Sequence, residues 1–216
     1  MIRRLGAVAV VITGVATASC GASPTPTAGT ATTTSVLVPV APSIDTVAVI
    51  GDSITVGAEP EVREALADIG VSVLAVDARS GRRTTVDHSV DSGIAAVRRV
   101  RETEPDLYVV ALGTNDVFSL DDGERAAAMI DGLLAELPEH VPLVWVDVHV
   151  VGDDGGSEVF NAALRARLGE RGEATIAGWH QVAMGSDLLR DGVHPTDAGD
   201  VVFAGVIAGA VADWRA

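Results

Sequence analysis

The chain has 216 residues, a formal net charge of −15 and no lysine. This excludes nucleic acid as a main ligand, because phosphate backbones require a basic protein face. Aromatic residues make up only 3% of the sequence, which argues against a long stacking platform for a polymer, and the single cysteine, Cys20, excludes an internal disulfide.

Residues 1–19 have the layout of an export signal. Two arginines precede an apolar run (5–16) that is too short to span a bilayer. The string TASCG (17–21) places small residues before a cysteine and resembles a bacterial lipobox, with Thr17 where an aliphatic residue is usual. We therefore expect export and lipidation of Cys20, which would attach the protein to a membrane through its N-terminus only. Secretion after cleavage by a different peptidase is the alternative.

The segment that follows, residues 20–43, is rich in Ser, Thr, Pro and Ala. Such a composition cannot bury enough apolar surface to offset the entropy of ordering the chain, so a flexible tether is expected. Residues 44–216 remain, and about 170 residues are enough for one well-buried domain.

Five apolar, β-branched runs alternate with stretches whose apolar residues have helical spacing. The predicted strands lie at about 45–50, 71–76, 106–112, 141–148 and 173–177. The predicted helices lie at about 57–69, 89–103, 122–137, 157–171 and 196–213. This alternation predicts an α/β domain, namely a three-layer α/β/α sandwich around a five-stranded parallel sheet.

Polar motifs follow the predicted strands. In chain order they are Gly51-Asp52-Ser53, Arg79-Ser80-Gly81-Arg82, Gly113-Thr114-Asn115-Asp116, His149 and Asp191-Gly192-Val193-His194-Pro195. Because the carboxyl ends of parallel strands share one edge of the sheet, side chains more than a hundred residues apart are expected to meet there.

The residue types at this edge suit acyl transfer. A serine hydroxyl such as Ser53 becomes a good nucleophile when a base removes its proton, and His194 is the best base available. Asp191, three residues earlier, could orient the imidazole and stabilise the imidazolium. The tetrahedral intermediate would need donors for its oxyanion, and the backbone N–H groups of Ser53 and Gly81 with the side-chain amide of Asn115 are the candidates.

Four of these motifs, taken together and in this order, resemble the blocks of the SGNH (GDSL-type) serine hydrolases. They are GDSI (51–54), SGR (80–82), GTND (113–116) and DGVHP (191–195), and the resemblance covers about residues 45–212. It implies a flavodoxin-like α/β/α sandwich, a nucleophile at Ser53, oxyanion donors at Gly81 and Asn115, and the pair Asp191 and His194. It also implies an esterase, lipase, thioesterase or acyltransferase with no metal or organic cofactor.

A looser resemblance concerns the extracellular SGNH domains of cell-wall O-acyltransferases. The similar strings are VDARSGRR (76–83), IAGWHQVA (176–183) and DGVHPTDAG (191–199), although Asp116 stands where that subgroup is expected to have a smaller residue. The chain contains no multi-pass membrane domain to supply acyl groups, which favours hydrolysis. The expected substrate is therefore a small acyl ester or an acylated glycan, and no pattern in the sequence specifies an oligomeric state.

Four further residues are candidates for substrate contact. Arg82 could bind a substrate oxygen or pair with one of the protein's own carboxylates, and Phe118 could form part of an acyl pocket because it follows Asn115 closely. His149 follows a strand and could contact substrate, while Trp179 could line the pocket.

Three alternatives to an exported hydrolase remain at this point. The first is a metal-dependent hydrolase that uses Asp52, Asp116, Asp191 and His194 as ligands. The second is an acyltransferase onto a cell-envelope glycan. The third is a non-catalytic glycan-binding module, against which the complete set of serine, histidine and aspartate argues.

Overall fold

The computed structural model of the protein describes residues 43–85 and 91–215. The predicted export signal, the tether and the lipidation site at Cys20 lie outside these residues, so they stay predictions. None of the helices within the described ranges is long and apolar enough to cross a bilayer.

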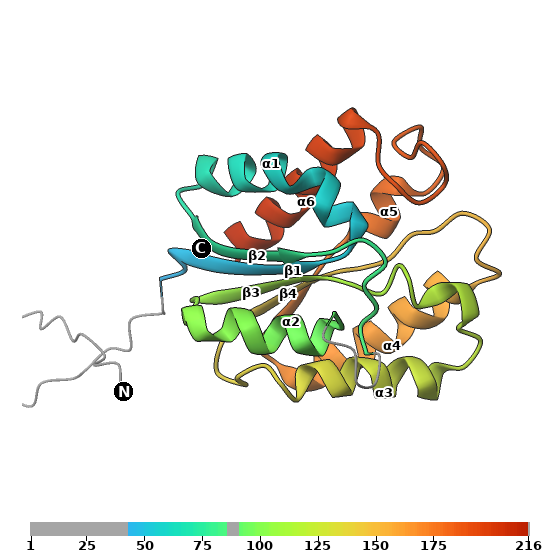
Figure 1. Cartoon of the computed structure of the whole chain (residues 1–216), viewed down its shortest axis with the longest axis horizontal. Coiled ribbons are helices and arrows are strands. Elements are labelled where there is room, and N and C mark those ends of the chain that lie inside the picture. The colour runs from blue at the N-terminus through green and yellow to red at the C-terminus, as the bar shows by residue number, and fades with distance from the viewer. Residues whose placement is uncertain (1–42, 86–90, 216) are drawn as a thin grey trace, which may run out of the picture. The chain divides into compact units, whose positions relative to one another are not determined.

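A five-stranded sheet forms the centre of the domain (Figure 1). Its strands are β1 (Thr46–Gly51), β2 (Ser72–Ala78), β3 (Leu107–Ala111), β4 (Leu143–Val146) and β5 (Ala174–Ala177). All neighbours pair in parallel, in the order β2-β1-β3-β4-β5, with Val49 of β1 opposite Val109 of β3. Parallel pairing follows from the helices that connect successive strands. The predicted sheet is therefore confirmed.

Helices cover both faces of this sheet, which confirms the predicted α/β/α sandwich (Figure 1). One face carries α1 (Ser53–Asp68), α5 (Trp179–Ala183) and α6 (Asp197–Ala212). The other carries α2 (Gly93–Val100), α3 (Gly123–Leu134) and α4 (Gly156–Arg171), with the short 3₁₀ turns η1 (Arg101–Thr103) and η2 (Val117–Ser119).

The hydrophobic core is divided by the sheet into two clusters. Along β1, Val47 and Val49 face the cluster under α1 and α6, whereas Ala48 and Ile50 face the cluster under α2, α3 and α4. All four are fully buried. A strand buried on both faces shows a continuous apolar run, which is why 45–50 was recognisable in the sequence.

Two features of the local structure differ from the sequence-based expectation. Helix α1 begins at Ser53, not near residue 57, because the Asp52 side chain caps it by accepting a hydrogen bond from the backbone N–H of Ile54 at 3.0 Å. The short helix α5 and the turn η2 were not predicted, since segments of three to five residues carry too little periodicity to be recognised.

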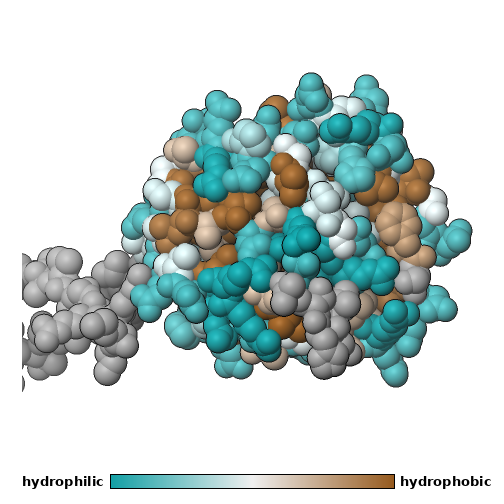
Figure 2. All heavy atoms as spheres, viewed as in Figure 1, coloured by the Kyte–Doolittle hydropathy of each residue, from teal (hydrophilic) through white to brown (hydrophobic). Residues whose placement is uncertain are grey.

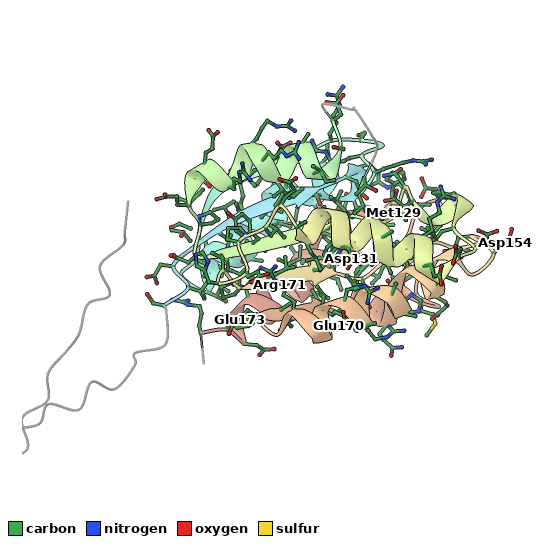
Figure 3. All side chains as sticks on the ribbon, turned by 90° about the horizontal axis from the view of Figure 1, so that it is seen from below. Met129, Asp131, Asp154, Glu170, Arg171 and Glu173 are labelled. Atoms are coloured by element: carbon green, nitrogen blue, oxygen red, sulfur yellow. The ribbon has the colours of Figure 1, made fainter. Side chains whose placement is uncertain are left out.

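Polar side chains fix the outer layer formed by α3 and α4 (Figure 3). Arg167 on α4 pairs with Asp131 on α3 at 2.9 Å, and Arg171 donates to the carbonyls of Pro138 and Val141 at 2.7 and 3.1 Å. The second contact ties the end of α4 to the turn before β4. In the view of Figure 2, hydrophilic side chains cover much of the face and apolar ones form separate groups.

Candidate active site

The site forms where the chain direction across the sheet reverses. From β1 the chain continues to β2 on one side, and from β3 it continues to β4 on the other, while β1 and β3 are neighbours. In open parallel sheets such a point leaves a crevice at the carboxyl ends of the strands. Ser53 follows β1 directly, and the segment 113–116 follows β3.

Ser53 is the first residue of α1, immediately after the capping residue Asp52. The first N–H groups of a helix have no acceptor within the helix, so this position offers a backbone donor beside the hydroxyl. Gly51 permits the tight turn from β1 into α1, because a Cβ there would lie 2.0 Å from Oγ1 of Thr55. The turn therefore requires glycine, and the hydroxyl of Ser53 remains partly exposed at its tip.

Ser53, His194 and Asp191 are hydrogen-bonded in series. Oγ of Ser53 lies 3.0 Å from Nε2 of His194, and Nδ1 of His194 lies 2.8 Å from Oδ2 of Asp191. The second carboxylate oxygen, Oδ1, accepts the backbone N–H groups of His194 and Val193 at 2.7 and 3.0 Å. Together these hydrogen bonds lower the pKa of Asp191 to about 2. The bond from the His194 backbone has the largest effect, followed by the bond from the His194 ring and the bond from the Val193 backbone. Asp191 is therefore an anion at neutral pH.

The loop that carries His194 is fixed at both ends. Leu189 and Pro195 form an isolated antiparallel bridge, and Thr196 caps α6 by accepting from the backbone N–H of Gly199 at 3.2 Å. On the outer side, the backbone N–H of Val151 donates to the carbonyl of Gly192 at 2.9 Å. The imidazole is nevertheless reachable, since 40% of the His194 side chain is exposed.

Gly81 and Asn115 are brought together by the fold. The amide Nδ2 of Asn115 donates to the carbonyl of Arg82 at 3.0 Å, so it lies beside the residue that follows Gly81. A side-chain amide has two N–H donors, which leaves one for a ligand. Gly81 has φ +74°, a conformation that glycine adopts without strain, and a Cβ there would face open space.

Comparison with protein families identifies the chain. The model of the GDSL-like lipase/acylhydrolase family matches residues 49–201, which is more than half of the sequence and includes Ser53, Gly81, Asn115, Asp191 and His194. The chain belongs to this family. It is therefore an SGNH serine hydrolase, as the sequence motifs indicated.

Solved structures share the fold. The C-terminal catalytic domain of the Streptococcus pneumoniae peptidoglycan O-acetyltransferase A, solved with a methylsulfonyl adduct, is 21% identical, with a TM-score of 0.63 over 81% of this chain and 96% of that one. TesA is 20% identical, with a TM-score of 0.61 over 78% and 99%. A G-D-S-L family lipolytic protein from Veillonella parvula is 17% identical, with a TM-score of 0.60 over 76% and 96%. No curated protein matches the sequence significantly.

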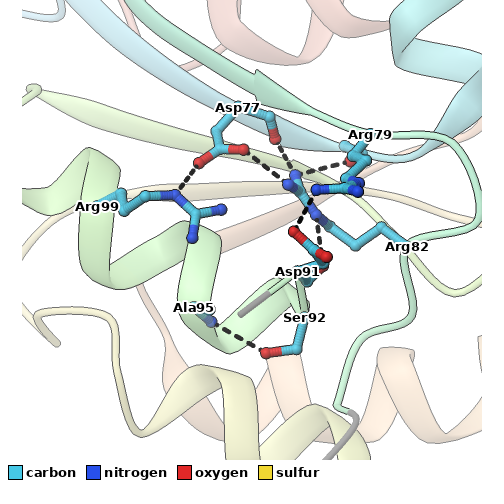
Figure 4. Close-up of polar contacts among 8 residues, drawn as sticks. Asp77, Arg79, Arg82, Asp91, Ser92, Ala95 and Arg99 are labelled. Atoms are coloured by element: carbon cyan, nitrogen blue, oxygen red, sulfur yellow. Dashed lines mark hydrogen bonds and ion pairs between the residues drawn. The ribbon is translucent and has the colours of Figure 1, made fainter. Parts of the chain in front are cut away.

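In this hydrolase Arg82 is buried against one of the protein's own carboxylates, so of its two predicted roles the ion pair is found and the substrate contact is corrected (Figure 4). Only 2% of its side chain is exposed, and its guanidinium binds the carboxylate of Asp77 at 2.7 Å. It also donates to the carbonyls of Gly51 at 3.1 Å, Asp91 at 3.0 Å and Asp77. Its donors thus join the end of β1, the end of β2 and the segment before α2. The sequence allowed an ion pair here but could not identify the acceptors, which are mostly carbonyls.

The four residues of the metal alternative do not assemble into a metal site. Oδ2 of Asp116 accepts from the backbone and hydroxyl of Thr84 at 2.9 and 2.8 Å, and Asp52 caps α1. Within residues 43–85 and 91–215, no three His, Cys, Asp or Glu side chains are grouped so that they could hold a metal ion. Asp116 instead links the segment after β3 to the one after β2.

Trp179 is in the core, so the prediction that it lines the substrate pocket is corrected. It is 1% exposed and packs edge-on against Phe203, with ring centroids 5.3 Å apart. His149 is half-buried beside His180 at 5.0 Å, and burial, followed by the charge of His180, lowers the pKa of His149. Phe118 is 57% exposed on η2 and is free to meet a substrate.

One exposed residue near the site was missed by the sequence analysis. Val151 is 63% exposed, and its backbone is bonded to Gly192, next to Asp191. The signal in the sequence was weak, since it is a single apolar residue at the start of a loop rich in Gly and Asp. Val151 and Phe118 offer apolar surface on the loops after β4 and β3.

Proposed function

We propose that the protein is an exported esterase that hydrolyses short-chain acyl esters through an acyl-enzyme on Ser53. One observation carries this proposal, namely the continuous hydrogen-bond series from Oγ of Ser53 through the imidazole of His194 to Asp191, with distances of 3.0 and 2.8 Å. Membership of the hydrolase family supports the reaction type.

In the first half-reaction, Oγ of Ser53 attacks the acyl carbon while Nε2 of His194 takes the hydroxyl proton. Asp191, anionic and bonded to Nδ1, stabilises the imidazolium that forms. The bond from the acyl carbon to the alcohol oxygen then breaks, and His194 returns the proton to the leaving alcohol. In the second half-reaction a water molecule gives a proton to His194 and attacks the acyl carbon. The bond from that carbon to Oγ of Ser53 then breaks, and His194 returns the proton to Oγ, which releases the acid and restores the hydroxyl.

The developing oxyanion would be bound by the backbone N–H groups of Ser53 and Gly81 and by the free amide N–H of Asn115. The support is positional, since all three follow the carboxyl ends of β1, β2 and β3, and Asn115 is held next to Arg82. The loss of one such donor typically lowers kcat by about 10²–10³.

The preference for short acyl groups is supported by how open the site is. Asp191 and His194 have 51% and 40% of their side chains exposed. Val151, which is bonded to Gly192, and Phe118, which follows Asn115 by three residues, are exposed apolar residues as well. An open surface with two apolar residues gives a short acyl chain enough contact but provides little burial for a long one.

An acetylated cell-envelope glycan is the substrate we favour. The support comes from the export-signal layout of residues 1–19 and from the strings shared with extracellular SGNH domains. The fold is also similar to that of the pneumococcal peptidoglycan O-acetyltransferase catalytic domain. Transfer of the acyl group to a glycan would use the same acyl-enzyme, with a sugar hydroxyl in place of water.

Active-site labelling tests the nucleophile. A fluorophosphonate should label the wild-type protein and leave Ser53→Ala unlabelled, while Ser72→Ala, at an exposed serine of β2, serves as the matched control and should label normally. Labelling of Ser53→Ala at the wild-type rate would disprove the proposal, as would activity that disappears with chelator and persists with fluorophosphonate.

Substrate assays test the remaining parts. Turnover of p-nitrophenyl esters should fall from acetate to octanoate, and acetate should be released from acetylated wall polymer. If the protein cleaves aryl acetates but releases no acetate from the polymer, the glycan substrate is wrong while the esterase stands. The assay with p-nitrophenyl acetate and a glycan acceptor distinguishes the transferase. A transferase would form more acetylated sugar than free acetate.

A further inference from the structure

A small cavity lies inside the domain next to the residue that precedes the nucleophile. Its free volume is about 10 Å³. The residues around it come from the ends of β3 and β4, from the segments after β1, β3 and β4, and from α1, α5 and α6. They are Asp52, Ile54, Ala111, Leu112, Thr114, Val146, Asp147, Val148, Trp179 and Phe203.

Two of the residues that line this cavity carry an unpaired polar atom. Among the described residues, Oδ2 of Asp52 and Nε1 of Trp179 are buried and have no partner that meets the distance and angle of a hydrogen bond. The Thr114 side chain is close enough to Asp52 to lower its pKa, but it forms no bond of that geometry with Oδ2. Each residue is only 1% exposed. Buried polar atoms are almost always hydrogen-bonded, so two of them around one cavity indicate a bound partner.

The chemistry of the two atoms specifies that partner. An indole N–H can only donate, and an ionised carboxylate oxygen can only accept, so the ligand must both accept and donate. A water molecule does both, and a cavity of this volume holds about one water. A metal cation fits poorly, because the N–H of Trp179 would point its positive end at the ion.

We propose that this cavity binds a single water molecule that accepts a hydrogen bond from Nε1 of Trp179 and donates one to Oδ2 of Asp52. The other oxygen of Asp52 caps α1 at Ile54, one residue after Ser53. The water thus joins the turn that carries the nucleophile to α5. The proposal concerns the interior of the fold and holds whatever ester the enzyme cleaves.

Other charged groups surround Asp52, and their influence on its pKa must be distinguished from that of the water. Asp116 follows β3, His194 precedes α6, and Asp147, which follows β4, lines the same cavity. Burial raises the pKa of Asp52 to about 6, although the Ile54 backbone, the Thr114 side chain and the charge of His194 lower it. The carboxylate is therefore ionised at neutral pH and able to accept from the water.

A high-resolution crystal structure at pH 8 gives the direct test. We expect one water peak with both distances, to Nε1 of Trp179 and Oδ2 of Asp52, in the hydrogen-bond range of about 2.7–3.2 Å. An empty cavity would overturn the proposal. A direct bond between the two side chains, or a water that contacts only one of them, would overturn it as well.

Titration of the Asp52 carboxyl by ¹³C NMR gives an independent test in solution. Because the indole N–H polarises the water toward the carboxylate, Trp179→Phe should raise the midpoint of Asp52, and Asp52→Asn identifies its resonance while keeping the cap. Trp214→Phe is the matched control, since Nε1 of Trp214 is also buried and unpaired but does not line the cavity. Equal midpoints in wild type and Trp179→Phe, or equal shifts in both tryptophan variants, would refute the bridge.

Discussion

Replacement of Arg82 by glutamine tests whether this residue holds the site together or binds substrate. The substitution removes a guanidinium that bonds the Asp77 carboxylate and the carbonyls of Gly51, Asp77 and Asp91. Breaking a buried ion pair typically costs about 3–5 kcal/mol of folding free energy. Because Asp77 keeps its bond to Arg99 at 2.7 Å, we expect the lower end, about 3 kcal/mol.

Chemical denaturation at pH 7 measures this loss, and thermal unfolding should show a fall in Tm of roughly 6–12 °C. Arg79→Gln is the matched control, because Arg79 pairs with Asp91 but is 60% exposed. An exposed pair of this kind contributes about 0–1 kcal/mol, so the control should unfold almost like the wild type.

The pH dependence follows from the carboxylate of Asp77. Burial raises the pKa of Asp77, but the hydrogen bonds from Arg99 and Arg82 outweigh it and leave this pKa lowered. A lowered carboxylate pKa adds stability above the unfolded pKa of about 3.9, and this stability is lost as the pH falls through the folded value. The difference between wild type and Arg82→Gln should thus be constant above about pH 5 and shrink in acid.

Activity separates the two roles of Arg82. Its carbonyl accepts from Asn115, so a loosened loop should lower kcat and leave KM nearly unchanged. If Arg82→Gln loses less than about 1 kcal/mol of stability while KM rises tenfold, the buried-pair reasoning is refuted and a substrate contact is favoured.

Three further substitutions have defined outcomes. Asp191→Asn should lower kcat by about 10³–10⁴ with little change in Tm, since the carboxylate is exposed but orients the imidazole; an unchanged kcat would contradict that role. Asp52→Asn removes a buried carboxyl whose raised pKa makes ionisation unfavourable in the folded state. Denaturation from pH 4 to pH 7 should therefore show the wild type losing about 3 kcal/mol of folding free energy relative to the variant as the pH rises to about 6. Parallel curves for the two proteins would contradict this. Gly113→Ala should lower the folding free energy by about 3 kcal/mol, because φ is +125° and a Cβ would lie 2.6 Å from Phe160. Gly123→Ala is the control, since open space surrounds Gly123. Its Tm should stay near that of the wild type, while the Tm of Gly113→Ala falls.

The sequence by itself was enough to predict the fold and to place the main site residues on it. Continuous apolar runs such as 45–50 identify strands buried on both faces, and the helical stretches between them require parallel pairing. Parallel pairing in turn places Ser53, Gly81 and Asn115 at one edge, because every strand ends on the same side. Local spacing also predicted that Asp191 lies beside His194, and their bond at 2.8 Å needs only a tight turn.

The tertiary structure decided which polar and aromatic side chains face the substrate and which are buried. Arg82 turns inward because carbonyls from β1, β2 and the segment before α2 converge on it, and those acceptors are invisible in a sequence. Trp179 is in the core because α5 packs it against Phe203, more than twenty residues away. The environment of a side chain depends on partners from distant segments, and only the folded chain brings those partners together.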